Sequence, residues 1–358
     1  MQLSQLKEDD VSSLYDFFVA HDFFSEPISK TQFEGQIRHY YLSSPLRLSY
    51  NLLARQKDGV VGSHLCIPLP FRVGNRALVA GLGSNLLLAE KSRSTVNFLN
   101  VQREYLRGYA PAGLQFVYGL VNRPGVLSLH CRTGYRALMR MPVRAVPINV
   151  AAFIAPRLPG RWLKSVAQWL AKPLNAFVLH LFTNLGPNSH LRVVETTSFA
   201  ELTDIDIDAW LGSKTVFGQR DHATLDWRFS SHMKRGYRKF LVKDNNDVHG
   251  YMVVREMPLK HLKALVIVDL LFPETRLDAG AALVRQALRL AHRQHVDICA
   301  TLLSPGSHVH RLFTRIFHFL NTPESFTLIA NVPNGAEYEA AINHPENWFV
   351  SWFDHDVV

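Results

Sequence analysis

The sequence has few cysteines. Cys66, Cys131 and Cys299 are the only three in 358 residues, and they lie far apart without a CxxC spacing. A disulfide framework needs several cysteines and a zinc site needs clustered ones, so the pattern favours neither. We expect a protein of a reducing, cytoplasmic compartment that holds no metal.

Long apolar runs are also missing. The first ten residues carry four charges, where a signal peptide would need an apolar core. The charge-free stretch PLNAFVLHLFTNLGPNSHL, residues 173–191, is interrupted by Pro, Asn, Gly and His, whereas a spanning helix needs about 20 apolar residues. These absences predict neither export nor a transmembrane segment, and favour a soluble or peripheral protein.

Acidic residues are fewer than basic ones. Lys plus Arg is 39 and Asp plus Glu is 30, so the formal charge is +9. An anionic partner fits this balance, such as a CoA-type cofactor, a phospholipid surface or RNA, and so does a basic surface without a specific partner. Hydrophobic residues make up 47% and charged residues 19%, which is typical of a globular chain. The length favours two domains.

Residues 1–147 alternate between helical and extended patterns. The strand-like runs are joined at Gly74-Asn75, a turn signal of β-hairpins, and a later strand ends in an Asn-Pro turn that leads into a helix. The patterns follow one another as helix (residues 8–24), hairpin strands (50–89), helix (94–113), and strand then helix (117–135). This order predicts a mixed α/β (α+β) domain with helices packed against a central sheet.

The same order begins again near residue 191, which indicates an internal duplication. Between the two halves, residues 148–190 are rich in proline and contain a short amphipathic piece with Trp162 and Trp169 on one face. We interpret this segment as a linker. Its aromatic face either packs on a neighbouring domain or makes a peripheral membrane contact through residues 157–174.

Four stretches carry a resemblance to a known family. VYGLVNRPGVLSLHCRTGY, residues 117–135, resembles the segment of GNAT-superfamily acyltransferases in which a strand ends near the acyl thioester and an Asn-containing turn starts a helix. LLLAEKSRSTVNFLNVQREYL, residues 86–106, occupies the place of that superfamily's pyrophosphate loop and following helix. LDWRF and NWFVSWFDHD, in the second half, look like tandem GNAT proteins of bacterial cell-surface polysaccharide gene sets.

The resemblance implies two GNAT-like domains, each a mixed central sheet flanked by helices. Residues 1–147 would form the acyltransferase domain, 148–190 the linker and 191–358 a second, degenerate domain. The implied reaction is acyl transfer from a thioester to an amine, in which a base takes the amine proton and an acid protonates the leaving thiolate. The implied acid lies four residues before Gly134, at His130, with Tyr118 as an alternative. Glu90 is the first candidate for the base, ahead of Glu104 and Asp269.

The pyrophosphate loop departs from the family pattern, Arg-Gly-x-Gly, because the matching residues 92–95 contain no glycine. Backbone N–H groups at a helix N-terminus and nearby cations could still hold phosphate, or the stretch could be an ordinary Ser/Thr helix cap. The residues that the resemblance assigns to acyl-CoA are Leu88, Lys91, Ser92, Arg93, Ser94, Thr95, Val96 and Asn122.

The sequence therefore predicts an acyl-CoA-dependent N-acyltransferase, with acetyl-CoA as donor and an amino sugar or other small amine as acceptor. Two alternatives stay open. One is an aminoacyl-tRNA-dependent peptidyltransferase of the tandem-GNAT type, the only one of these functions that involves nucleic acid. The other is a non-catalytic GNAT-like binding module, which the missing loop glycines favour.

Overall fold

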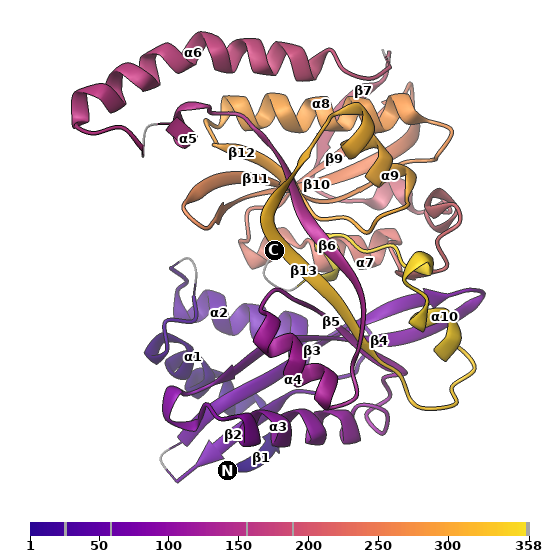
Figure 1. Ribbon diagram of the computed structural model, residues 1–358. Coiled ribbons are helices and arrows are strands. Elements are labelled where there is room, and N and C mark those ends of the chain that lie inside the picture. The colour runs from indigo at the N-terminus through magenta and orange to yellow at the C-terminus, as the bar shows by residue number, and fades with distance from the viewer. Residues whose placement is uncertain (25–26, 58, 155–156, 188–189, 356–358) are drawn as a thin grey trace.

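A computed structural model describes residues 1–24, 27–57, 59–154, 157–187 and 190–355. Within these ranges, thirteen strands form one continuous sheet through the molecule (Figure 1). In the first half, α1 and α2 pack on one face of this sheet, and α3 and α4 pack on the other. The mixed α/β architecture predicted from the alternating patterns is confirmed.

The elements follow the predicted order closely. The strands are β1 (Gln2–Gln5), β2 (Leu52–Gln56), β3 (Gly59–Val73), β4 (Arg76–Leu88), β5 (Phe116–Val121), β6 (Arg136–Pro147), β7 (Arg192–Thr196), β8 (Val216–Gly218), β9 (Arg238–Asp244), β10 (Asp247–Leu259), β11 (Leu262–Leu271), β12 (Ile298–Thr301) and β13 (Leu320–Asn331). The helices are α1 (Val11–Ala20), α2 (Lys30–Ile37), α3 (Thr95–Gly108), α4 (Pro124–Arg132), α5 (Ala151–Ile154), α6 (Arg161–Thr183), α7 (His222–Arg228), α8 (Leu277–Arg293), α9 (His308–Arg311) and α10 (Glu339–Asn343).

The two halves of the chain exchange strands at the centre of the sheet. The order there is β5-β13-β6-β12, so β13 separates β5 from β6, and β6 separates β13 from β12. β6 ends the first half and β13 lies near the end of the second, and each has 12 residues. At about 3.3 Å per residue such a strand reaches about 40 Å. β6 pairs with the second-half strands β13 and β12, and β13 pairs with the first-half strands β5 and β6. The boundaries of the predicted domains stay a prediction, but the halves share their central strands.

Each half also contains a parallel strand pair joined through a helix. α3 connects β4 to β5, and α8 connects β11 to β12. This crossover follows from the change of pattern from alternating to helical and back in each half. The internal duplication stays a prediction. Parallel neighbours end at the same edge of a sheet, so each pair brings a strand end and a helix start together.

The proline-rich segment between the halves forms one long helix for most of its length. α6 has 23 residues, continues through Pro173 and packs on α8. Proline removes one backbone N–H from a helix interior, yet α6 ends only at Thr183. Within the described ranges, neither α6 nor any other helix has the length and apolar composition needed to cross a bilayer.

Candidate active site

The first half contains an opening between two parallel strands. β4 pairs with β5 only through Ala80, Gly81 and Leu82, which lie opposite Phe116, Val117 and Tyr118. Beyond these residues β4 continues to Leu88 and β5 to Val121 without a ladder between them. Backbone N–H and C=O groups that face such an opening can bond an extended ligand.

Glycines border this opening where it begins. A Cβ atom on Gly119 would lie 3.6 Å from the carbonyl oxygen of Gly83, and one on Gly83 would lie 3.6 Å from the carbonyl oxygen of Tyr118. Neither glycine has a positive φ, so the backbone conformation does not require them. Their effect is to leave the point where the β4–β5 ladder ends free of side chains from these two positions.

A bulge in β4 separates the two strands. Ser63 of β3 lies opposite Leu87 and Leu65 lies opposite Ser84, so β4 has one residue more than β3 in this stretch. Asn85 is in the bulge with a φ of 47°. Its side-chain amide and the hydroxyl of Ser84 both donate to the Tyr41 hydroxyl, at 2.9 and 3.1 Å. These bonds hold the bulge, which bends β4 away from β5.

The left-handed conformation of Asn85 gives a direct test of the bulge. Asparagine tolerates a positive φ and a β-branched residue does not. We expect Asn85→Val to lower the free energy of unfolding by about 2 kcal/mol, and Asn85→Gly, which removes the same hydrogen bond but allows the conformation, to cost less than about 1.5 kcal/mol. Urea unfolding of both variants measures the difference. Equal losses would show that the backbone conformation at Asn85 is not strained.

Two helix N-termini lie at the edge to which the opening leads. α3 begins at Thr95, after a 3₁₀ turn at Glu90–Ser92, and α4 begins at Pro124. Because β4 and β5 are parallel, both helices start beyond the carboxyl ends of these strands. Helix N-termini present unpaired N–H groups and partial positive charge, which favour phosphate.

The predicted pyrophosphate residues gather at the start of α3. Ser94 is the N-cap, and its hydroxyl accepts from the Asn97 backbone N–H at 3.2 Å. Ser92 is buried, and its hydroxyl accepts from Gln56 at 3.4 Å. The Ser94 hydroxyl thus caps α3, and the Ser92 hydroxyl joins the loop to the end of β2. The backbone N–H groups of Thr95 and Val96 have no hydrogen-bond partner among the described residues, and both residues are exposed.

Two of the remaining predicted ligand residues lie beside this start of α3, and two lie at the ends of the strands that border the opening. Lys91 and Arg93 are exposed beside the helix start, Leu88 is buried at the end of β4, and Asn122 is exposed at the other lip of the opening, just before α4. The loop therefore offers backbone N–H groups and two cations to an anion. This donor set fits a pyrophosphate without the glycines of the family pattern.

His130 lies on α4 with its ring turned inward. His130 is only 7% exposed and packs between Phe98 and Tyr135. Burial lowers its pKa to about 4. The ring is therefore neutral near pH 7, whereas the predicted acid would be an imidazolium. Its catalytic role stays a prediction.

His64, which the sequence did not single out, lies near His130. Burial, and to a smaller extent His130, lowers the pKa of His64 to about 3. The His64 ring packs on the Tyr105 ring with centroids 3.8 Å apart and planes tilted by 31°, and its Nε2 would be 3.4 Å from a Cβ on Gly83. Within the described residues, the buried Nδ1 of His130 and Oε1 of Gln102 have no hydrogen-bond partner. Such atoms favour a water or a ligand group beside them.

These histidines predict a pH dependence of stability. Their folded-state pKa values lie below the ordinary 6.5, so the unfolded chain takes up protons first as the pH falls. The contribution of these two histidines to the free energy of unfolding is therefore complete above about pH 6.5 and is lost as the pH falls toward 4. His130→Gln removes one such group, so we expect its unfolding free energy to fall by about 3 kcal/mol less than that of the unmodified protein over this range. Urea unfolding from pH 7 to 4 measures this, and parallel curves would contradict it.

The other predicted catalytic residues, Tyr118 and Glu90, do not lie beside the His130 ring. Tyr118 packs against Phe71 and Trp348, and its hydroxyl donates to Asp354 at 3.3 Å. Its neighbour Val117 packs on the α3 side instead, so Tyr118 points to the opposite face of β5. Glu90 is exposed in the turn before α3. Both assignments stay predictions, and Tyr118 and His130 cannot act together across the strand.

The second half has the corresponding strand pair, but its opening is filled. β11 pairs with β12 as far as Ile267 and Thr301, and β11 then bulges at Val268. The segment that follows α10 occupies the gap: the Ser304 N–H donates to the Val350 carbonyl at 2.8 Å, and Leu303 forms a bridge with Ser351. Both halves thus have a bulge in the strand before the crossover helix, β4 in the first half and β11 in the second. They differ because a later segment of the chain fills the gap between the strands in the second half.

A buried ion cluster lies where this C-terminal segment meets β11. Arg220 is fully buried and pairs with Asp269 at 3.0 Å and Asp354 at 3.1 Å. Ser351 and Tyr251 each donate to Asp269 at 2.7 Å. The carboxylates hold the pKa of the Arg220 guanidinium above its usual value despite its burial. Asp269, a weaker candidate for the base, therefore has a structural partner.

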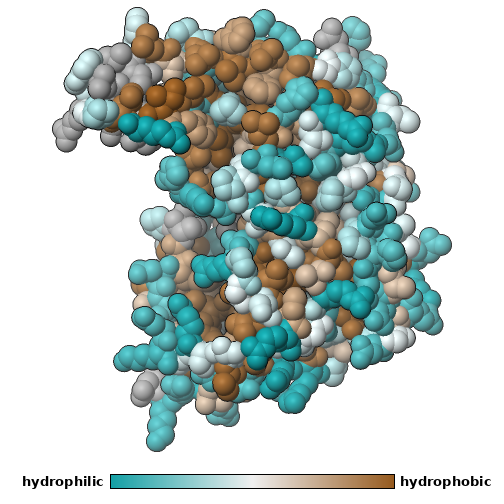
Figure 2. All heavy atoms as spheres, viewed as in Figure 1, coloured by the Kyte–Doolittle hydropathy of each residue, from teal (hydrophilic) through white to brown (hydrophobic). Residues whose placement is uncertain are grey.

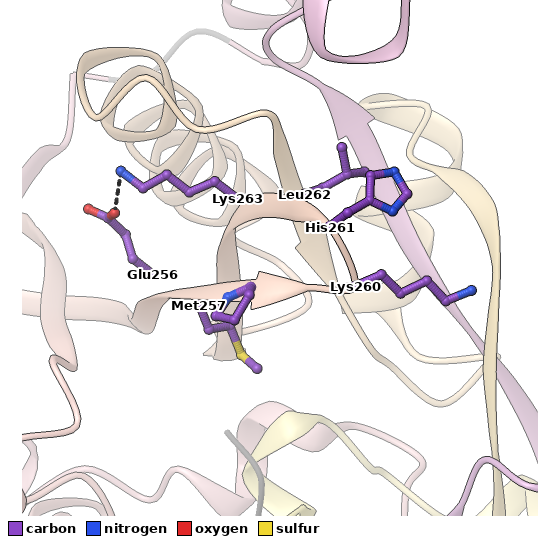
Figure 3. A pocket seen from close by; sticks show the side chains of 7 residues that line it. Glu256, Met257, Lys260, His261, Leu262 and Lys263 are labelled. Atoms are coloured by element: carbon purple, nitrogen blue, oxygen red, sulfur yellow. Dashed lines mark ion pairs between the residues drawn. The ribbon is translucent and has the colours of Figure 1, made fainter. Parts of the chain in front are cut away.

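A separate depression of about 350 Å³ lies at the β10–β11 hairpin. One hairpin supplies all its lining residues, and the Lys263–Glu256 ion pair, 2.8 Å, crosses one side of it (Figure 3). Lys260 extends away from that pair (Figure 3). The depression contains neither a strand opening nor a helix N-terminus, so we place the candidate site at β4 and β5.

No family model and no curated protein matches the sequence. The fold matches solved structures. A GCN5-related N-acetyltransferase from Anabaena variabilis has a TM-score of 0.60 and 10% identity, over 93% of this chain and 73% of that one. N-myristoyltransferase from Saccharomyces cerevisiae with bound myristoyl-CoA has a TM-score of 0.61 and 10% identity, over 92% and 78%. The corresponding values for a GCN5-related N-acetyltransferase from Kribbella flavida are 0.59 and 12%, over 92% and 70%. The protein has the GNAT fold.

Proposed function

We propose that the protein is an acyl-CoA-dependent N-acyltransferase of the cytoplasm, with acetyl-CoA as donor and an amino sugar or another small amine as acceptor. The opening between β4 and β5 carries this proposal, because it combines unpaired strand backbone, a glycine-lined mouth and two helix N-termini at one edge. Structures named as N-acetyl- and N-myristoyltransferases share the fold. The filled opening of the second half favours the first half as the donor site and the second as a wall of the acceptor site.

The chemistry follows from this placement. The pyrophosphate of the donor lies at the start of α3, against the N–H groups of Thr95 and Val96, and the thioester lies between β4 and β5. The amine nitrogen, once deprotonated, attacks the thioester carbon, and a backbone N–H of the diverging strand stabilises the oxyanion. Collapse of the tetrahedral intermediate forms the amide and releases the thiolate, which takes a proton. If His130 supplies a needed group, the His130→Gln variant loses turnover, and unchanged turnover removes that role.

Thr95→Pro tests the pyrophosphate site with little change to the fold. Proline is accepted at the first position of a helix, where it removes only an N–H that has no helical partner. Ser94, the residue before it, already has the extended conformation that proline requires, with φ −133° and ψ 157°. We expect affinity for acetyl-CoA to fall about tenfold or more, because a charge-assisted hydrogen bond is lost.

The matched control is Thr95→Ala, which keeps the N–H and removes the hydroxyl. Calorimetric titration with acetyl-CoA measures the affinity of both variants, and thermal unfolding confirms that both fold. If Thr95→Pro binds acetyl-CoA as tightly as Thr95→Ala does, the phosphate does not lie at the start of α3. Binding of tRNA that salt weakens, without binding of any acyl-CoA, would instead favour the aminoacyl-tRNA alternative.

A further inference from the structure

The outer face of α6 is apolar and uncovered. Trp162 is 68% exposed and Trp169 is 69% exposed. The other apolar side chains exposed on α6 are Leu170, Leu174, Phe177 and Leu181. One of the two interpretations of the sequence, that the tryptophans pack on a neighbouring domain, is therefore wrong. Figure 2 shows apolar residues gathered along the end of the molecule that α6 forms in Figure 1.

These side chains lie on one side of the helix. At 3.6 residues per turn, Trp162, Trp169, Leu170, Leu174, Phe177 and Leu181 fall within an arc of about 140°. Ala171, which is buried, lies outside this arc, on the side of the helix toward the body of the protein. An ordinary surface helix has a polar outer side and an apolar inner side. α6 has apolar residues on both, so its outer side is suited to an apolar environment.

The stretch of chain that contains α6 carries charge of one sign. From residue 105 to residue 194 the sequence contains no Asp or Glu, and it contains eleven Lys and Arg. Four of the eleven, Arg157, Arg161, Lys164 and Lys172, lie just before α6 or within it. Trp and Leu on one side of a helix with nearby cations are the features of helices that lie in the interface of an anionic bilayer. A second copy would bring the same positive charge against this face.

We propose that α6 holds the protein on an anionic lipid surface, lying in the plane of the interface with Trp162, Trp169 and Phe177 among the headgroups and upper acyl chains. The helix has 23 residues and is about 35 Å long, and its N-terminal end extends beyond the body of the molecule (Figure 1). This inference is independent of the proposed acyltransferase function.

The test uses the full chain and vesicles of phosphatidylcholine, with or without phosphatidylglycerol. We expect co-flotation with the phosphatidylglycerol vesicles only, and less of it at high salt. Trp210, Trp348 and Trp352 are buried and Trp227 is half-buried, so tryptophan emission that moves to shorter wavelength on binding reports Trp162 and Trp169. The double variant Trp162→Ser/Trp169→Ser should bind about tenfold or more weakly and lose this spectral shift.

The control double variant is Val19→Ser/Leu320→Ser, which removes two exposed apolar side chains from other parts of the surface. It should bind vesicles like the unmodified protein. Light scattering gives the oligomeric state of each variant. A dimer that the tryptophan substitutions dissociate, without vesicle binding, would show that a second copy covers α6 and would overturn the proposal. So would a monomer that binds neither kind of vesicle, or equal binding by both double variants.

Discussion

Arg220→Ala is expected to lower the free energy of unfolding by about 3 to 5 kcal/mol, because it leaves two buried carboxylates without their cation. Asp269 and Asp354 are both at most 1% exposed, so water cannot replace the guanidinium. The cluster joins β11 to the C-terminal 3₁₀ turn Trp352–Asp354 and, through Tyr118, to β5 of the first half. Its loss should therefore loosen both halves together. Urea unfolding followed by fluorescence measures the change.

The neutral triple variant Arg220→Met/Asp269→Asn/Asp354→Asn is the control. It removes the cation together with the charges that need it, so it should be less destabilised than Arg220→Ala, although it carries three substitutions. If Arg220→Ala costs less than about 1 kcal/mol, or if the triple variant loses more stability than Arg220→Ala, the ion cluster does not stabilise the filled opening as described.

Gly119→Val is expected to weaken the binding of acyl-CoA strongly while the protein stays folded. Valine suits a strand, and its Cβ would lie 3.6 Å from the Gly83 carbonyl, an ordinary contact. The added methyl groups enter the space between β4 and β5, where we place the thioester. Affinity for acetyl-CoA should fall about 100-fold or more. Calorimetric titration measures the affinity, and urea unfolding shows whether the fold is kept.

Gly119→Ala is the matched control, because its methyl group reaches the same first position without extending further. It should keep most of the affinity. Binding of acetyl-CoA by Gly119→Val with unchanged affinity would mean that the donor does not pass between the strands. If both variants lose binding and stability together, the pairing of Gly119 with Ile329 of β13 has been disturbed instead, and Gly83→Ala and Gly83→Val replace them in the same test.

Local patterns predicted the elements of the fold, and non-local contacts could not be predicted in the same way. The start of α3 at Ser94-Thr95 and the turn at Gly74-Asn75 depend on neighbouring residues alone, and both are confirmed. The pairing of β13 with β5 joins residues about 200 positions apart, and nothing in either strand specifies that partner. The exchange of β6 and β13 therefore became visible only in the structure.

The candidate site shows the same division. The strand end, the Asn-Pro turn and the residues at the start of α3 could be assigned from the sequence, since they are consecutive. His64 could not be assigned, because it comes from β3 and meets His130 only through the packing of α3 and α4 on the sheet. Gly83 and Gly119 were visible as glycines within strand patterns, a signal of close approach that would have located the opening. The partner of Asp269 was hidden, because Arg220 lies 49 positions away in the chain.

The most direct test of the central claim is a calorimetric titration of the unmodified protein and Gly119→Val with acetyl-CoA, and with a longer acyl-CoA such as myristoyl-CoA. Saturable binding to the unmodified protein of at least one donor, lost in Gly119→Val and kept in Gly119→Ala, is the predicted result. Failure of the unmodified protein to bind either donor, or binding that Gly119→Val leaves unchanged, would contradict the placement of an acyl donor between β4 and β5.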